Sequence, residues 1–275
     1  MITKIPISNP FPEIHIAIQA ALEAGKEVLD VYNQDFHLSI KNDNEPITEA
    51  DVKSNNIIQK ILGTSQYPIL SEEEQDNKNR LDSRKIWIVD ALDGTSDFIK
   101  KTGEFTIMIS LVEDHLPILG VVYWPTKSIL YVAQKSKGAF RSFNGIWSKL
   151  SVSKISKLEN CRVVGSRFHI SELEQTLIKN FNISKFTSKG SSLKVMEIST
   201  GNAELYFTTT DKIKQWDTCA SYCLITEAGG KITDMSGKAL TYNTERLNHE
   251  NGVLVSNGII HDQILKIYRE YMKNN

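Results

Sequence analysis

Two carboxylates stand three residues apart at the end of an apolar run. Residues 86–89 have the composition of a buried strand, Asp90 follows them directly, and Asp93 comes three positions later. The Gly-Thr-Ser segment at 94–96 then opens a predicted helix, whose first backbone N–H groups could bind an anion. Carboxylate oxygens beside such donors are suited to holding Mg²⁺ against a phosphate. The stretch therefore predicts metal-assisted chemistry on a phosphate ester.

Three further acidic positions could contribute to the same chemistry, and each also has a structural explanation. Asp51 closes a Thr-x-x-Asp pattern with Thr48, which is the signature of a helix start. Glu72 and Glu73 belong to an acidic run that could be a solvated loop. Asp217 stands where it could cap the N-terminus of the following helix. Taken singly, each position favours the structural explanation.

The hydrophobic pattern predicts the elements that must position these side chains. Apolar residues recur at helical spacing over 12–32, and a second helix is expected to run through residues 57–62. Strands are predicted at 67–70, 86–89, 105–112, 118–124, 129–133, 139–143, 162–164, 203–207, 231–233 and 253–255. Further helices are predicted at 171–179, 193–199, 217–228 and 259–271. The order indicates an α+β part (residues 1–155), with an antiparallel meander that ends at Asn144-Gly145, followed by an α/β part (156–275).

The composition indicates a soluble globular chain with a small-molecule partner. The 275 residues carry 32 basic and 33 acidic side chains, a net charge of −1, which argues against a nucleic-acid polymer or an anionic membrane as partner. We expect no membrane span and no signal peptide, because the longest apolar runs are too short. The three cysteines, Cys161, Cys219 and Cys223, are predicted to pack in the core, and a reducing cytoplasm is the expected compartment.

Four motifs in a fixed order carry a family resemblance. They are Pro-Ile-Thr-Glu-Ala-Asp at 46–51, Ser-Glu-Glu at 71–73, Asp-x-Leu-Asp-Gly-Thr at 90–95 and Trp-Asp at 216–217. In this order they resemble the inositol monophosphatase superfamily of lithium-sensitive, Mg²⁺-dependent phosphatases, and the similarity extends to residues 256–258. The resemblance implies the layered αβαβα sandwich of the inositol monophosphatase and fructose-1,6-bisphosphatase type.

The resemblance also implies roles for individual residues. Two or three Mg²⁺ ions would be bound by the side chains of Glu72, Asp90, Asp93 and Asp217 and by the backbone carbonyl of Leu92. The catalytic residues would be Asp51, Thr95 and Glu73, with Asp51 and the Thr95 hydroxyl activating a water molecule. The amides of Gly94, Thr95 and Ser96 would bind the phosphate at a helix N-terminus. Cations are needed in such a pocket, because carboxylates that repel one another would otherwise be protonated.

Several segments resemble one branch of the superfamily, the bacterial sulfur-assimilation type of 3′(2′),5′-bisphosphate nucleotidase. They are the segments at 97–106 and 117–123, the Gly-Ser-Arg-x-His motif at 165–169 and the Gly-Ser-Ser-Leu-Lys motif at 190–194. The substrate implied is adenosine 3′,5′-bisphosphate. His169, Ser192 and Lys194 would hold its second phosphate, although alone each reads as an ordinary strand-end or helix-surface residue.

Two departures from this branch bear on the substrate. An arginine that the branch usually carries near position 208 is replaced by Thr208, which removes a bidentate phosphate ligand, and Lys212 or Lys214 would have to compensate. Glu45 stands where a small hydroxyl residue is usual. An inositol monophosphatase or another sugar-phosphate phosphatase therefore stays open as an alternative, as does, with less support, an inactive nucleotide-binding sensor. If the chain assembles, a homodimer is the expected form.

Overall fold

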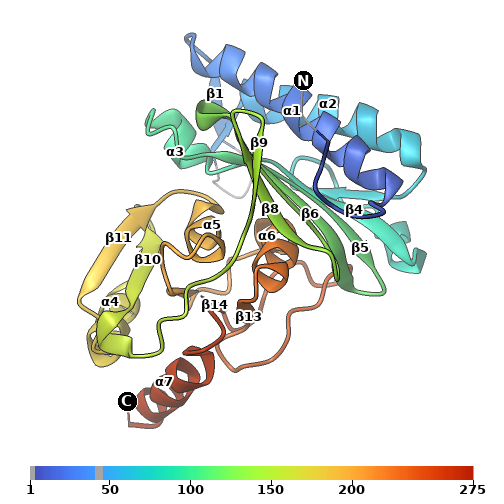
Figure 1. Ribbon diagram of the computed structural model, residues 1–275. Coiled ribbons are helices and arrows are strands. Elements are labelled where there is room, and N and C mark those ends of the chain that lie inside the picture. Colours follow the sequence, from blue (N-terminus) through green and yellow to red (C-terminus); the bar gives the residue numbers. More distant parts are fainter. Residues whose placement is uncertain (1–3, 41–45, 275) are drawn as a thin grey trace.

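Helices and sheets alternate in five layers, and the computed structural model describes residues 4–40 and 46–274 of the chain (Figure 1). Glu45 lies outside the described residues. The three helical layers consist, in order, of α1 (Pro12–Tyr32) with α2 (Glu49–Leu62), α5 (Leu193–Ser199) with α6 (Gln215–Glu227), and α4 (Glu172–Asn180) with α7 (His261–Asn274). A seven-stranded sheet lies between the first two layers and a five-stranded sheet between the last two. The αβαβα sandwich expected from the sequence is confirmed.

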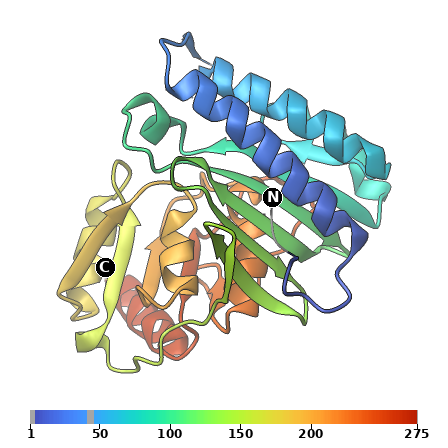
Figure 2. The same ribbon diagram turned by 45° about the horizontal axis from the view of Figure 1, so that its top comes forward.

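The first layer is a pair of helices that lie side by side across the large sheet (Figure 2). Helix α1 begins at Pro12, whose fixed φ suits the first helical position, and its stripe of small and branched apolar side chains is fully buried against the sheet. The helix spans the range that its hydrophobic period predicted. Within the described residues, no helix has the continuous apolar length that a bilayer crossing requires.

The seven-stranded sheet has the order β3-β4-β5-β6-β7-β8-β9, antiparallel except for the β3–β4 pair. Its strands are β3 (Ile69–Ser71), β4 (Lys85–Asp93), β5 (Thr106–Glu113), β6 (Leu116–Trp124), β7 (Ile129–Gln134), β8 (Gly138–Phe143) and β9 (Ile146–Lys149). The expectation that the meander ends at Asn144-Gly145 is wrong. These residues have φ of 51° and 78°, the left-handed geometry of a tight hairpin turn, and they lead into β9.

Strand β4 continues to Asp93, four residues beyond its predicted end at residue 89, and it contains a bulge. Asp90 pairs with Met108 and Asp93 with Thr106, so three steps along β4 match two steps along β5. In a regular strand, side chains three positions apart point to opposite faces, and the extra residue brings Asp90 and Asp93 toward the same side. The short helix α3 (Thr95–Ile99) follows directly after Gly94, whose φ of 95° suits glycine.

The five-stranded sheet has the order β11-β10-β12-β14-β13 and is mixed. Its strands are β10 (Arg162–Ser166), β11 (Lys185–Lys189), β12 (Leu205–Thr208), β13 (Lys231–Thr233) and β14 (Val253–Ser256). Strand β10 is parallel to both neighbours, whereas β14 is antiparallel to β12 and β13. The sequence did not predict β11, because its side chains are mostly exposed and lack an apolar alternation. Nor did it predict the two-stranded sheet of β1 (Leu38–Ile40) and β2 (Pro46–Thr48).

Helix α6 links the two sheets and lies close to β6. A Cβ atom on Gly120 of β6 would be 2.4 Å from the backbone oxygen of Ala220, so this contact requires glycine. Cys219 and Cys223 are buried along the same helix, and Cys161 is buried elsewhere, as expected for core cysteines. The change from one sheet to the other falls between β9 and β10, near the predicted boundary at residue 155. We retain the division into two parts as a proposal.

Candidate active site

A cavity of about 620 Å³ opens where the end of β4 meets the five-stranded sheet and the helices in front of it. Its walls come from the β4–α3 segment, from the first turns of α5 and α6, and from the segments that follow β10 and β12. The predicted site residues on its walls are Glu72, Asp90, Leu92, Asp93, Gly94, Thr95, Ser96, His169, Ser192, Lys194 and Asp217. The structure therefore brings together residues from both halves of the sequence.

Three carboxylates converge on one side of this cavity. Oxygen atoms of Glu72, Asp90 and Asp217 all lie within 4.8 Å of one another. Glu72 follows β3, where its backbone N–H donates to the Val89 oxygen at 3.3 Å. Asp217 occupies the third position of α6, and the expectation that it is the N-cap is wrong. The helix begins two residues earlier, at Gln215, and an Asp217 oxygen accepts a hydrogen bond from the Lys214 N–H at 2.7 Å.

Asp93 lies beside this group but is oriented by other residues. One of its oxygens accepts a hydrogen bond from the Ser192 backbone N–H, and the Thr106 hydroxyl lies 3.4 Å from the same oxygen. The Ser192 and Thr106 hydroxyls are 2.7 Å apart. Thr106 was not singled out from the sequence, because its contact with Asp93 exists only once β5 pairs with β4. These bonds hold one Asp93 oxygen and leave the other for a ligand.

Burial and mutual repulsion dominate the electrostatics of the converging carboxylates. Burial raises the pKa of Asp90 well above its usual range, and the negative charges of Glu72, Asp93 and Asp217 raise it further. Burial and Glu72 likewise raise the pKa of Asp217. Burial raises the pKa of Asp93 too, although Lys194 opposes that effect. Converging hard oxygen donors with an excess of negative charge fit divalent cations such as Mg²⁺.

Asp51 caps α2 and also contacts Thr95. One of its oxygens accepts from the Thr48 N–H at 2.8 Å and from the Thr48 hydroxyl at 2.6 Å, completing the capping box of α2. The other oxygen accepts from the Thr95 hydroxyl at 3.2 Å. That hydroxyl is also 3.4 Å from the Leu92 oxygen. Burial raises the pKa of Asp51, which makes its carboxylate a stronger base.

Lys194 and His169 also line the cavity. The Lys194 ammonium donates to the Ser191 oxygen at 2.6 Å and lies 5.4 Å from the centre of the Tyr206 ring. Burial lowers its pKa, while the charge of Asp93 opposes this effect. His169 is exposed, and partial burial of its ring together with Lys194 lowers its pKa. Both side chains can donate hydrogen bonds to an anion in the cavity.

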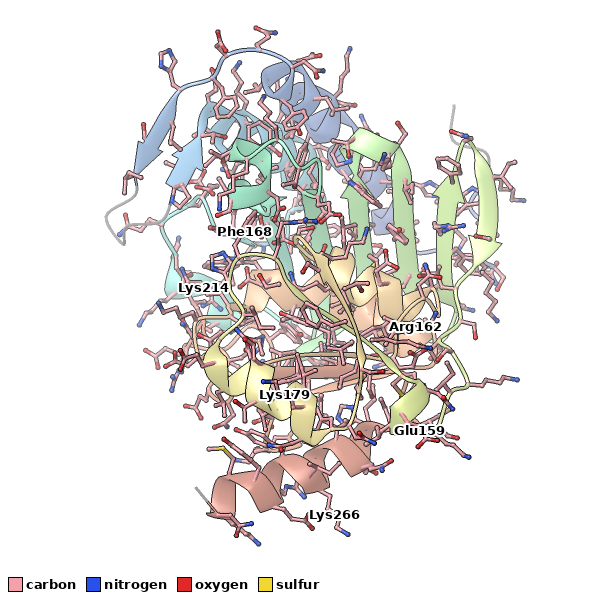
Figure 3. The ribbon with its side chains drawn as sticks, turned by 90° about the vertical axis from the view of Figure 1, so that its left-hand side faces the viewer. Glu159, Arg162, Phe168, Lys179, Lys214 and Lys266 are labelled. Carbon is pink, nitrogen blue, oxygen red and sulfur yellow. The ribbon has the colours of Figure 1, made fainter. Side chains whose placement is uncertain are left out.

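The segment at 165–169, which carries His169, contacts the N-terminal part of the molecule through Arg167 and Phe168. Arg167 does not line the cavity, and its guanidinium donates to Glu104 at 2.6 Å. The Lys100 ammonium lies 3.5 Å from the centre of the Phe168 ring, next to α3 (Figure 3). Glu104 also accepts from the Gly190 N–H at 2.8 Å. The Gly-Ser-Arg-x-His motif therefore contributes a cross-link at its arginine and a cavity wall at its histidine.

Not every predicted residue reaches the cavity. Glu73 is partly buried beside Glu72 but is absent from the cavity wall, and its N–H lies 3.4 Å from the Ser71 hydroxyl. Thr208 lines the cavity where an arginine was expected, and Lys212 lines it too. Lys214, just before α6 (Figure 3), instead places its ammonium 5.2 Å from the Trp216 ring centre.

Comparison with known proteins places this constellation in a family. A family model described as the inositol monophosphatase family matches residues 11–273. This chain belongs to the inositol monophosphatase family. Among curated members, the 3′(2′),5′-bisphosphate nucleotidase CysQ of Buchnera aphidicola is 38% identical over 230 residues, which cover 82% of this chain and 85% of that protein. The CysQ of Escherichia coli K12 is 35% identical over 231 residues, covering 82% and 91%.

Solved structures of the family agree with the fold. CysQ from Bacteroides thetaiotaomicron superposes with a TM-score of 0.76 at 30% identity, covering 90% of this chain and 97% of that one. An IMPase from Thermotoga maritima gives a TM-score of 0.81 at 25% identity, covering 96% and 99%. The predicted family and the predicted enzyme class, a phosphoric monoester hydrolase, are thereby confirmed. The family is metal-dependent, and the acidic group formed by Glu72, Asp90 and Asp217 could bind the metal.

Proposed function

We propose that this chain is a Mg²⁺-dependent 3′(2′),5′-bisphosphate nucleotidase that converts adenosine 3′,5′-bisphosphate to AMP and phosphate. The observation that carries the proposal is the cavity itself, which is lined by the converging carboxylates and by the cationic side chains of Lys194 and Lys212. The relatives named 3′(2′),5′-bisphosphate nucleotidase, at 38% and 35% identity, support the choice of substrate.

The metal ligands in this proposal are Glu72, Asp90, Asp93, Asp217 and the Leu92 carbonyl. Bound there, two or three Mg²⁺ ions would neutralise the carboxylates, acidify the attacking water and stabilise the leaving oxygen. The donor set fits this role because the three carboxylates converge, and burial together with their mutual repulsion raises the pKa of Asp90 and Asp217. The amides of Gly94, Thr95 and Ser96, on the cavity wall, would hold the phosphate oxygens.

Asp51 and Thr95 are placed to handle the proton of the attacking water. The Thr95 hydroxyl donates to Asp51 and can therefore accept a hydrogen bond from water with its free lone pair. As water attacks phosphorus, its proton passes to this pair, the bond between phosphorus and the 3′-oxygen breaks, and the 3′-oxygen leaves in line. Glu73 does not line the cavity, so in this proposal it contributes to catalysis by positioning the loop that carries Glu72.

The second phosphate would bind near Lys194 and His169. These side chains and the Ser192 region, which all line the cavity, offer donors, and Lys212 adds a positive charge that acts on His169. Thr208 supplies a hydroxyl in place of a guanidinium, so the affinity for this phosphate would depend mainly on Lys194. Inositol 1-phosphate has no second phosphate to bind there.

Phosphate release from adenosine 3′,5′-bisphosphate and from inositol 1-phosphate, measured side by side, tests the proposal. We expect kcat/KM for the nucleotide to be at least ~10-fold higher, since one phosphate contact with a buried lysine contributes that much. Preference for the inositol ester would overturn the nucleotidase assignment and keep the phosphatase. Binding of the nucleotide without any phosphate release would show an inactive sensor.

A further inference from the structure

Glu72 and Asp217, two of the three converging carboxylates, belong to different parts of the fold. Glu72 lies in the turn after β3, and Asp217 lies in the first turn of α6. The near end of the Glu72 loop is held by Asn55 of α2, which accepts from the Ser71 hydroxyl and donates to Glu74, both at 2.7 Å. Besides the packing of α6 on the large sheet, contacts that join the far end of this loop to α6 can set the separation between Glu72 and Asp217.

The far end of the loop carries a buried arginine. Arg80, in the 3₁₀ helix η2 (Lys78–Asp82), is 3% exposed. Its guanidinium donates two hydrogen bonds to Asp76, at 2.7 and 2.9 Å, four residues beyond Glu72. A third bond, at 2.8 Å, goes to the Asn243 side-chain oxygen. A fork-shaped donor that uses its nitrogens on both partners fixes their relative position.

Asn243 connects η2 to α6 through hydrogen bonds. Its side-chain amide donates to the backbone oxygens of Arg80 and Ser83, at 3.2 Å each, and its backbone N–H donates to the Gln215 side-chain oxygen at 2.7 Å. Gln215 is the first residue of α6, and its amide donates to the Thr244 hydroxyl and the Arg246 oxygen at 2.8 Å each. Residues 242–249, here called the strap, thus join η2 to the turn of α6 that contains Asp217.

A second contact of the strap reinforces the same helix turn. The buried His249 ring nitrogen lies 2.8 Å from the Thr218 hydroxyl, and the Tyr242 hydroxyl donates to that same oxygen at 3.1 Å. Thr218 is the residue after Asp217. The strap therefore contacts the start of α6 at Gln215 and at Thr218, on both sides of Asp217, the proposed metal ligand.

We propose that Arg80, Asn243 and Gln215 are positioning residues that set the distance between Glu72 and Asp217, and with it the affinity of the site for a divalent cation. The inference rests on the proposed function, because it assumes that these carboxylates bind the metal. Residues that orient metal ligands without contacting the metal typically change its affinity by about 10–100-fold when they are removed. The network is buried and fully paired, so it favours one geometry.

Mn²⁺ binding to the metal-free protein, followed by the electron paramagnetic resonance signal of the free ion, tests this without substrate. Asn243→Gly removes three side-chain hydrogen bonds, and glycine tolerates the φ of 53° at this position. Arg80→Lys keeps a positive charge beside Asp76 but loses the fork to Asn243. We expect the Kd for Mn²⁺ to rise ~10-fold or more in Asn243→Gly and by a smaller factor in Arg80→Lys. At saturating metal, we expect KM for the nucleotide to stay within about twofold of wild type.

Lys78→Ala is the matched control. The Lys78–Glu245 ion pair joins the same two segments at 2.8 Å, but both side chains are exposed, so its loss should leave the Kd unchanged. Equal Kd values in the wild type, the control and both network variants would overturn the positioning role while leaving the metal site intact. Absence of Mn²⁺ binding in the wild type would instead overturn the metal site of the proposed function.

Discussion

Asp90, which is buried, and Lys194, which is partly buried, face the same cavity, but their surroundings differ. The neighbours of Asp90 are further carboxylates, which together with burial raise its pKa well above the usual range. The Lys194 ammonium already donates to the Ser191 oxygen and is attracted by Asp93. Like charges and burial therefore act together on the carboxylate side, where a bound cation would relieve both, whereas the lysine is already paired with protein groups. Metal binding is therefore the better determined half of the proposal.

Removing one carboxylate should have the largest effect. Asp90→Asn or Asp93→Asn should lower kcat/KM by ~10³-fold or more, because each removes a proposed metal ligand. Asp262→Asn is the control, since this carboxylate pairs with Lys231 on the surface. Near-wild-type turnover of Asp93→Asn at saturating Mg²⁺ would show that the metal ligands are assigned wrongly.

Asp51→Asn should affect the rate and spare the metal. The amide keeps an oxygen for the cap of α2 but is no longer a base toward Thr95, so kcat should fall by ~10²–10³-fold. The affinity for Mn²⁺ should stay close to that of the wild type. A variant that loses both kcat and metal affinity would place Asp51 among the ligands instead.

Lys194→Met tests whether Lys194 binds the second phosphate. KM for adenosine 3′,5′-bisphosphate should rise about 10-fold with little change in kcat, whereas KM for adenosine 3′-monophosphate should change less than twofold. Lys266→Met, on the exposed face of α7 (Figure 3), is the control. A fall in kcat with both substrates would mean that Lys194 acts through Asp93 and not on the second phosphate.

The smallest effect concerns the stability of the metal-free protein. The pKa values of Asp90 and Asp217 are raised in the folded state, so the folded protein binds protons more tightly than the unfolded chain. His249 and His261, whose pKa burial lowers to about 4, act in the opposite direction over the same interval, so the effect is measured against Asp90→Asn, which keeps both histidines. In EDTA, the free energy of unfolding of the wild type, relative to that of Asp90→Asn, should increase as the pH falls from 7 toward about 5, and Mg²⁺ should abolish this difference. Thermal unfolding of both proteins at several pH values measures it, and an identical pH dependence of the two would show that the pKa of Asp90 is not raised.

The sequence determined the elements and the motif residues better than the contacts between them. The period of α1 and the Thr48–Asp51 capping box were readable because both arise from residues close together in the chain. The bulge that directs Asp90 and Asp93 to one side depends on the register with β5, which no local pattern contains. The Arg80–Asn243 bond joins residues 163 positions apart, so the strap could not be predicted.

The product formed from adenosine 3′,5′-bisphosphate tests the central claim most directly. Phosphorus NMR of the reaction distinguishes AMP from adenosine 3′-phosphate and shows which ester bond is broken. We predict that inorganic phosphate and AMP appear in equal amounts with Mg²⁺ and that neither appears with EDTA. Release of the 5′-phosphate, or equal turnover in EDTA, would contradict a metal site that holds the 3′-phosphate against Asp90 and Asp217.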